Sequence, residues 1–137
     1  MATFRLEIVT PEARTYSDDV DMVTLPGEDG EMGILPHHAP LLGMLKPGEL
    51  RLKKGAQETS MAIGEGFVEV APDRVSVITE LAVEEKFIDE AAVQAAIERA
   101  QAALKERNLG HEEVAAIESS IARSIAQLNL KRKRRGN

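Results

Sequence analysis

The side chains best suited to bind a metal or act as nucleophiles are few in this chain, which has three histidines and no cysteine. His37 and His38 are adjacent, and neighbouring side chains of an extended segment point in opposite directions, so the two rings do not converge on one ion. No cysteine and no carboxylate–histidine spacing completes a ligand set. We therefore predict no metal site and a surface position for this pair.

Patterns for catalysis and cofactor binding are also missing. Residues 30–33, Gly-Glu-Met-Gly, are not followed by the Lys-Ser or Lys-Thr of a phosphate-binding loop and do not lead into a helical pattern. No serine is accompanied by the histidine and acid that would activate it. The absence of cysteine excludes thiolate chemistry and disulfides. We expect no catalytic residue and no cofactor.

The formal net charge of −6 is distributed unevenly. Residues 1–86 carry 8 basic and 16 acidic side chains, a balance of −8, whereas residues 87–137 carry 9 and 7, a balance of +2. Five basic side chains are consecutive: Lys131, Arg132, Lys133, Arg134 and Arg135. A basic run without aromatic residues, on an acidic body, disfavours nucleic-acid binding. It is typical either of a solvated tail or of a segment that docks on an acidic protein surface.

The stretch 25–50 organises the first part of the chain, because it holds four of the six prolines and five of the ten glycines. The apolar pieces between them are too short for helices and fit strands joined by tight turns. Residues 36–40, Pro-His-His-Ala-Pro, form a loop with a stiffening proline at each end. A rigid loop loses little entropy on docking, so we predict a recognition surface there.

Alternating apolar and polar residues predict strands throughout residues 1–86. Turn signals separate these strands at a spacing of about ten residues, which favours an antiparallel sandwich or a small barrel. The expected strands are residues 4–10, 20–25, 49–53, 59–63, 67–70 and 75–79, in addition to the short pieces of the stretch 25–50.

Helical periodicity begins only after residue 86. Residues 87–108 contain neither proline nor glycine, with Asp89 as the predicted N-cap and Gly110 as the predicted left-handed stop. A second helix follows a short linker, so the two helices should pack antiparallel. Their predicted apolar stripes are Val93, Ile97, Ala100 and Leu104, and then Val114, Ile117, Ile121, Ile125 and Leu128.

This hairpin is thin because alanine dominates it. Its apolar contact is worth about 25 cal/mol per Å², whereas ordering the backbone costs about 1–2 kcal/mol per residue. We therefore expect the hairpin to be marginal alone and able to detach from the rest of the chain. The patterns predict an α+β fold with the strands first, divided into domains at residues 1–86 and 87–137.

With an acidic strand-built part followed by a detachable two-helix hairpin, the chain resembles the epsilon subunit of the bacterial and chloroplast F-type ATP synthase over its whole length. The likeness is carried by residues 25–42 (Leu-Pro-Gly-Glu-Asp-Gly-Glu-Met-Gly-Ile-Leu-Pro-His-His-Ala-Pro-Leu-Leu), 45–51 (Leu-Lys-Pro-Gly-Glu-Leu-Arg), 66–70 (Gly-Phe-Val-Glu-Val) and 75–78 (Val-Ser-Val-Ile). The chain departs from the family at His37, where Gly or Asn is usual. The resemblance implies an N-terminal antiparallel ten-stranded β-sandwich and a C-terminal antiparallel two-helix hairpin.

The resemblance also implies a non-catalytic rotor subunit. In the family the sandwich clamps the gamma subunit and stands on the ring of c subunits. Glu31 then falls at the ring, and His38 lies in the loop at the junction of gamma and the ring. The implied contact residues are Glu31, Pro36, His38, Ala39 and Pro40.

The hairpin resembles the regulatory element of the family. Folded down, it lies along the sandwich; extended, it reaches the alpha and beta subunits of the catalytic head and blocks ATP hydrolysis. The implied contacts to beta are Arg123, Lys131, Arg132, Lys133, Arg134 and Arg135.

Some members of the family bind ATP in the folded hairpin through the motif Ile/Leu-Asp-x-x-Arg-Ala. Here Ile88 and Asp89 match, and Arg123 matches a ligand position, but Ala92 replaces the arginine and Gln127 stands where another arginine would help. Each lost charge-assisted hydrogen bond costs about 1.5–3 kcal/mol. We predict weak or absent ATP binding.

No apolar run reaches the roughly 20 residues that span a bilayer, and the start of the chain shows no targeting pattern. We expect a soluble protein that meets the membrane only through its complex, at the cytoplasmic face of a bacterial inner membrane rather than at a chloroplast thylakoid. Two other hypotheses remain: a free-standing sandwich module whose helical arm oligomerises, and a nucleic-acid binder that uses the basic run.

Overall fold

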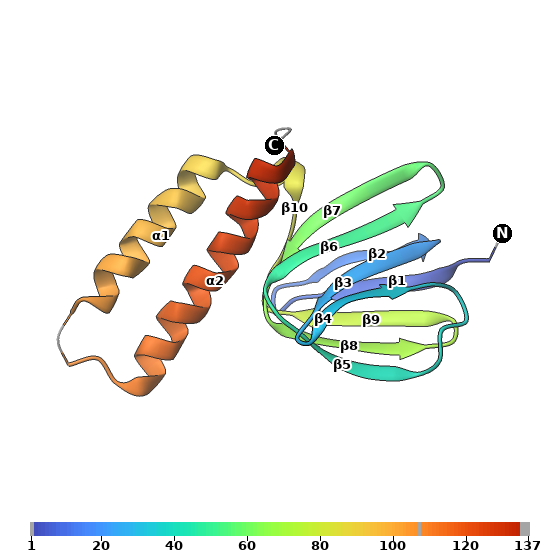
Figure 1. Cartoon of the computed structure of the whole chain (residues 1–137), viewed down its shortest axis with the longest axis horizontal. Helices are drawn as coiled ribbons and strands as arrows, with labels where there is room; N and C mark the ends of the chain where they lie inside the picture. The colour runs from blue at the N-terminus through green and yellow to red at the C-terminus, as the bar shows by residue number, and fades with distance from the viewer. Residues whose placement is uncertain (1, 107, 135–137) are drawn as a thin grey trace.

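The computed structural model describes residues 2–106 and 108–134. Strands occupy the first part of the chain and helices the last, as the sequence predicts (Figure 1). The strands are β1 (Phe4–Val9), β2 (Arg14–Val20), β3 (Met22–Gly27), β4 (Gly30–Ile34), β5 (Leu41–Leu45), β6 (Gly48–Lys54), β7 (Gln57–Ile63), β8 (Gly66–Ala71), β9 (Arg74–Thr79) and β10 (Ala82–Glu84). A 3₁₀ turn, η1 (Glu85–Phe87), leads to the helices α1 (Glu90–Leu104) and α2 (His111–Arg134).

The ten strands form one hydrogen-bonded sheet that folds back on itself as a sandwich (Figure 1). One layer runs β2-β1-β9-β8-β5 and the other runs β4-β3-β6-β7-β10, and the pair Gly27 with Leu45 joins the two ladders. Inward side chains of both layers meet in one aliphatic core, which makes the sandwich a packed and stiff body. Its largest fully buried side chains are Leu6, Ile8, Leu25, Ile34, Leu50, Met61 and Ile63.

The strand pairing corrects the expectation of a purely antiparallel sandwich. β1 and β9 run parallel, with Leu6 beside Val75 and Ile8 beside Val77. Every other pairing among the described strands is antiparallel. The sheet is therefore mixed, and the count of ten strands implied by the resemblance is confirmed.

β8 begins at a glycine for a steric reason. Gly66 pairs with Thr79, and a Cβ on Gly66 would stand 1.9 Å from the carbonyl oxygen of Ile78. No side chain fits in that space, so the close approach of β8 to β9 requires glycine at this position.

The two ends of α1 differ in how well the sequence predicts them. Asp89 caps α1 as expected, since its Oδ1 accepts a 3.1 Å hydrogen bond from the N–H of Ala92. The left-handed residue is Asn108, with φ of 69°, and not Gly110. Asparagine tolerates this conformation because its side chain is short and polar. Gly110 instead precedes α2, where its N–H donates to the side chain of Glu113.

α1 and α2 form the expected antiparallel hairpin, and α2 lies between α1 and the sandwich (Figure 1). Val93, Ile97 and Leu128 are buried as predicted. Ile125 was wrongly placed in the stripe, because it is 43% exposed and Ser124 takes the inward position. Neither helix of the described residues is both long and apolar enough to cross a membrane.

Candidate functional site

One face of α2 is applied to the sandwich, and we call it the seam. Its members recur every three or four positions, which is the spacing of one side of a helix. Two of them are buried, and the other three bond to carboxylates of the sandwich. The seam consists of Ser119, Arg123, Ala126, Leu130 and Lys133.

Leu130 of the seam belongs to a small apolar cluster that shares no residue with the sandwich core. The strands contribute Ala62 of β7, which is fully buried, with Val83 of β10 packed beside it. The helical segment supplies Ile88, Val93, Ile97, Leu128 and Leu130. Because Ala62 is small, α2 approaches β7 closely but buries little apolar area there. Charged contacts therefore matter for how firmly the hairpin is held.

Arg123 holds the middle of the seam. Its Nη1 lies 2.9 Å from Oε2 of Glu80, in the β9–β10 loop, and donates to Oγ of Ser119 at 3.1 Å. Ser119 in turn donates to Oε1 of Glu65 at 3.4 Å. The stem of Arg123 crosses Gly64, where a Cβ would come within 3.0 Å of Cδ of the arginine. The middle of α2 is thus fixed at the end of the sandwich.

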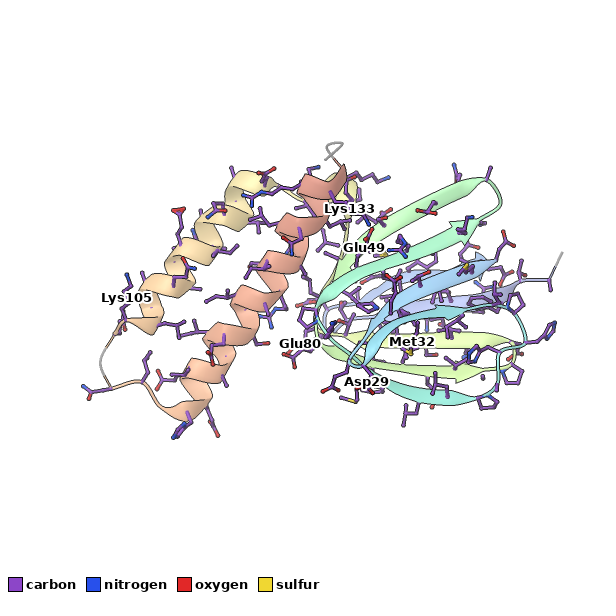
Figure 2. All side chains as sticks on the ribbon, in the orientation of Figure 1. Asp29, Met32, Glu49, Glu80, Lys105 and Lys133 are labelled. Atoms are coloured by element: carbon purple, nitrogen blue, oxygen red, sulfur yellow. The ribbon has the colours of Figure 1, made fainter. Side chains whose placement is uncertain are left out.

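Lys131, Arg132 and Lys133 of the basic run at the end of α2 are each paired with an acidic side chain of the same chain. Nζ of Lys131 lies 3.5 Å from Oε1 of Glu85 and 3.3 Å from its carbonyl oxygen. Nζ of Lys133 lies 2.9 Å from Oε1 of Glu49 on β6, and Figure 2 shows these two labelled side chains next to each other. The positive end of the hairpin therefore meets the acidic body within one molecule.

Arg132 contacts α1 rather than the sandwich. Nε of Arg132 lies 3.3 Å from Oε2 of Glu90, so this arginine ties α2 to the start of α1 within the hairpin. The side chain of Arg134 and all of Arg135 lie outside the described residues.

Glu49 is the most enclosed carboxylate that the seam contacts, with its side chain 18% exposed. Burial alone would raise the pKa of this carboxyl, but hydrogen bonds from Lys133 and Ser60 and the charges of Lys133 and Arg51 lower the pKa overall. The docked hairpin thus favours ionised Glu49.

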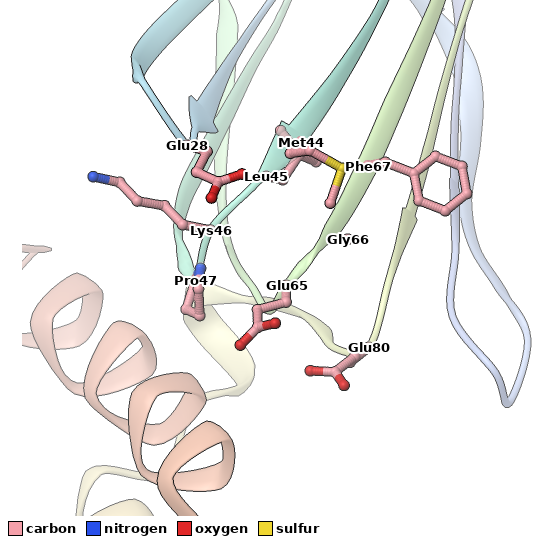
Figure 3. A pocket seen from close by; sticks show the side chains of 9 residues that line it. All are labelled: Glu28, Met44, Leu45, Lys46, Pro47, Glu65, Gly66, Phe67 and Glu80. Atoms are coloured by element: carbon pink, nitrogen blue, oxygen red, sulfur yellow. The ribbon is translucent and has the colours of Figure 1, made fainter. Parts of the chain in front are cut away.

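A pocket opens at the end of the sandwich that faces α2 (Figure 3). Its charged lining consists of Glu28, Glu65, Glu80 and Lys46. The three carboxylates outnumber the single lysine, and their net negative charge repels anions, so the pocket does not suit a nucleotide or a phosphate. Glu65 and Glu80 already accept hydrogen bonds from α2, so the pocket borders the surface on which the hairpin docks. Among the described residues, no group of three metal-ligating side chains is present.

Glu31 lies in β4 directly after the β3–β4 turn and is exposed. Arg51 reaches it from β6, with Nη2 3.2 Å from Oε1 of Glu31. Nη1 of the same arginine lies 3.4 Å from Oε1 of Glu49. The predicted ring contact is therefore joined to the carboxylate that holds Lys133.

The predicted recognition loop is a tight turn. The N–H of His38 donates to the carbonyl of Leu35 at 3.2 Å, and Pro36 presets the second position. His37 occupies the third position with φ of 66°, in the left-handed region that favours glycine. A residue with a Cβ pays about 1–2 kcal/mol for that conformation. Nδ1 of His38 donates to the carbonyl of Ala39 at 2.7 Å, and Pro40 beyond it is exposed.

The structure does not gather Glu31 and His38 into one cluster. Glu31 is the second residue of β4, and His38 lies in the turn beyond the far end of that strand; the three steps from Glu31 to Ile34 alone span roughly 10 Å at about 3.3 Å per residue. Among the described strands β4 pairs only with β3, so its outer edge is free. Glu31 therefore lies on β4 itself, whereas Pro36, His38, Ala39 and Pro40 lie in the segment that joins β4 to β5.

Sequence reasoning missed an exposed apolar face on the outer side of β5, β8 and β9. Met44 pairs with Phe67 and Phe67 with Ile78, so the three side chains lie in a row. They are 59%, 40% and 37% exposed, and nearby Leu42 is 70% exposed. Adjacent exposed apolar side chains mark an interaction surface. The available signal was the run Leu-Leu-Gly-Met-Leu at 41–45, which is apolar on both faces of a strand.

The three candidate ATP ligands are not brought together. Ile88 is buried in the apolar cluster, Asp89 caps α1, and Arg123 turns to the sandwich. The arginine that contacts the start of α1 is Arg132 and not Arg123. Arg132 lies nine residues further along α2 than Arg123, which is roughly 13 Å at about 1.5 Å per residue.

Residues 3–85 match the family model described as "ATP synthase, Delta/Epsilon chain, beta-sandwich domain". A protein named ATP synthase epsilon chain from Dehalococcoides mccartyi is 42% identical over 135 residues, covering 98% of this chain and 96% of the relative. One of the same name from Alkalihalophilus pseudofirmus is 46% identical over 104 residues, covering 76% of this chain and 78% of the relative.

Two solved structures share the fold. A chain of the Euglena gracilis mitochondrial ATP synthase has a TM-score of 0.73 at 24% identity, covering 92% of this chain and 79% of that one. A chain of the central stalk and c ring of the Tetrahymena thermophila mitochondrial ATP synthase has a TM-score of 0.58 at 14% identity, covering 97% and 96%. At these identities the likeness concerns the fold alone.

Proposed function

Because this chain belongs to the ATP synthase epsilon-chain family, we propose that it is a non-catalytic central-stalk subunit of a proton-translocating ATP synthase. It couples rotation of the c ring to the gamma subunit and restrains ATP hydrolysis through its hairpin. The observation that carries this proposal is the extent of the likeness, since the relative from Dehalococcoides mccartyi matches sandwich and hairpin together over 98% of the chain. The proposal includes a location at the cytoplasmic face of the inner membrane of a bacterial cell, where the subunit is held by its complex.

The sandwich supplies the two stalk contacts in this proposal. The apolar row of Met44, Phe67 and Ile78 offers a surface for a lasting contact with gamma, because buried interface centres are rich in Phe and Met. β4 carries Glu31 near one end and the turn of residues 36–40 lies beyond its other end, which suits the polar loops of the c ring and their junction with gamma. A packed core lets the sandwich transmit torque without deforming.

The hairpin, residues 87–137, acts as a separate regulatory domain on the base of residues 1–86. It leaves the sandwich when three of its basic side chains exchange their partners in the chain for acidic side chains of the beta subunit. The three pairs that break are Arg123 with Glu80, Lys131 with Glu85, and Lys133 with Glu49. Arg132, Arg134 and Arg135 extend the contact with beta. The thin apolar cluster and the partly exposed ion pairs support this exchange, because both states then differ by only a few kcal/mol. Contacts with alpha follow from the same extended position.

Truncation of the chain after residue 86 tests the division of labour in the assembled complex. We expect the complex to assemble and to synthesise ATP, while its rate of ATP hydrolysis rises. Loss of assembly, or an unchanged hydrolysis rate, would refute the regulatory role of the hairpin.

ATP itself is not a ligand in this proposal. Ala92 is exposed where the family motif has an arginine, and Arg123 is already paired with Glu80. Isothermal titration of the full chain with ATP should give no micromolar binding, and such binding would show that other side chains form the site.

A further inference from the structure

Four charged side chains connect the edge of β4 to the end of α2. Glu31 accepts from Nη2 of Arg51 at 3.2 Å, and Nη1 of Arg51 lies 3.4 Å from Oε1 of Glu49. The same Oε1 accepts from Nζ of Lys133 at 2.9 Å. Figure 2 shows Glu49 and Lys133 meeting where β6 passes the end of α2. A continuous row of alternating charges thus runs from the sandwich edge to the hairpin.

The strand register explains why these side chains meet. Glu49 and Arg51 stand two residues apart on β6, so they share one face of the sheet. β3 lies between β6 and β4, with Thr24 opposite Arg51 and Pro26 opposite Glu31, and Arg51 reaches across it. The fold therefore fixes the positions of the three sandwich residues whether or not the hairpin is present.

Arg51 and Glu49 are the shared members of the row. Their side chains are 27% and 18% exposed, so solvent screens them less than Glu31 and Lys133, which are both 58% exposed. Arg51 divides its two amino groups between two carboxylates, and Oε1 of Glu49 divides its lone pairs between two cations. A change in the interactions of Glu31 or Lys133 therefore alters how strongly Arg51 and Glu49 bind the residue at the other end of the row.

We propose that the row Glu31–Arg51–Glu49–Lys133 couples occupation of the β4 edge to release of the hairpin. A polar partner that takes Glu31 leaves Arg51 free to bind Glu49 with both amino groups. Arg51 then competes with Lys133 for Oε1, and the end of α2 is held less firmly. Because coupling is reciprocal, an undocked hairpin also frees Glu31 for the partner. The inference rests on the proposed function in taking Glu31 as a ring contact and the hairpin as mobile.

The test measures hairpin opening in the isolated full chain, so it needs neither the ring nor ATP hydrolysis. The chain has no cysteine, and Ala126 is an 8% exposed member of the seam, so Ala126→Cys provides a single thiol that a reagent reaches when the hairpin opens. Glu31→Gln imitates loss of the Glu31–Arg51 pair. We expect it to raise the labelling rate about twofold to threefold, because partly exposed ion pairs have modest energies.

Asp29→Asn is the matched control, since it removes the same charge two residues away in the exposed β3–β4 turn. It should leave the labelling rate unchanged. Lys133→Gln should itself raise the rate, and adding Glu31→Gln to it should give no further increase, because neighbours in one network are not additive. An unchanged or slower rate for Glu31→Gln, an equal rise for Asp29→Asn, or a full further rise in the Lys133→Gln background would each overturn the coupling. Such a result would leave the truncation experiment, and with it the proposed function, unaffected.

Discussion

Replacing Leu130 by alanine tests whether the hairpin is held independently of the sandwich. Leu130 is 2% exposed and belongs to the apolar cluster with Ala62 and Leu128, but it is not a member of the sandwich core. Its loss should therefore weaken docking of α2 on β7 without disturbing the packing between the two sheet layers.

The expected magnitude follows from the volume removed. Truncation of a buried leucine to alanine costs about 2–5 kcal/mol, with the lower values where the surroundings close the cavity. Because α2 is able to shift against β7, we expect about 2–3 kcal/mol, which lowers the ratio of docked to undocked hairpin roughly 30- to 150-fold. Ile125→Ala is the control on the same helix: Ile125 lines the open hollow between α2 and Pro47 but is 43% exposed, so its truncation should cost clearly less, about 1 kcal/mol.

Two signals separate the parts of the molecule during urea unfolding. Far-ultraviolet circular dichroism is dominated by the helices, whereas Tyr16 is the only tyrosine in a chain without tryptophan and packs against the sandwich core. In Leu130→Ala the helical signal should be lost at a urea concentration about 1–3 M lower, for a slope of about 1–2 kcal/mol per M. The tyrosine transition should stay in place.

Coincident shifts of both signals in Leu130→Ala would contradict this reasoning. They would mean that hairpin and sandwich unfold as one cooperative unit, so that no undocked hairpin exists on an intact base. An equal shift in Ile125→Ala would refute the assignment of the seam.

Three other outcomes follow from single positions. Gly66→Ala should abolish soluble expression or the native melting transition, because its Cβ would stand 1.9 Å from the carbonyl oxygen of Ile78; a native-like thermal melt would show that β8 and β9 separate easily. His37→Gly should raise the free energy of unfolding by up to about 1 kcal/mol, since relief of the left-handed conformation exceeds the entropy cost of glycine, and lower stability in urea would contradict that. The docked Lys133 lowers the pKa of Glu49 below its ordinary value of 4.5 together with Ser60 and Arg51, so the stability that the Lys133–Glu49 pair adds is complete above that value and is lost as pH falls through the lowered pKa. Helix unfolding measured between pH 6 and 3 should therefore depend on pH less steeply in Glu49→Gln, and identical profiles would refute the role of this carboxylate.

Local sequence patterns predicted the elements whose signal lies within a few residues. Asp89 was identified as a cap because its neighbours follow a helical pattern, and the strands around Leu6 and Val75 were found from their alternation. β2 was missed because its segment Arg-Thr-Tyr-Ser-Asp-Asp-Val lies at the sheet edge and is mostly polar. The parallel pairing of β1 with β9 was missed because alternation reports which face is buried and not which strand is adjacent.

The contacts of the candidate site were harder to predict, because local patterns do not report which distant segments meet in the fold. Lys133 was noticed as part of a basic run, but its partner Glu49 is 84 residues away in the chain and only the fold brings them together. Gly110 was favoured as the left-handed residue because glycine is the usual choice, whereas Asn108 takes that role two residues earlier. The apolar row containing Phe67 depends on the register of three strands, which no local pattern specifies.

The most direct measurement of the regulatory role is ATP hydrolysis by a complex whose hairpin is locked to the sandwich. The side chains of Ser119 and Glu65 meet at 3.4 Å, so Ser119→Cys with Glu65→Cys places two thiols of this cysteine-free chain within reach of a short reducible cross-linker such as a bis-methanethiosulfonate. The account predicts that the locked complex hydrolyses ATP as fast as the complex truncated after residue 86, and that reduction restores the restraint. A locked hairpin that restrains hydrolysis as strongly as the free one would contradict it.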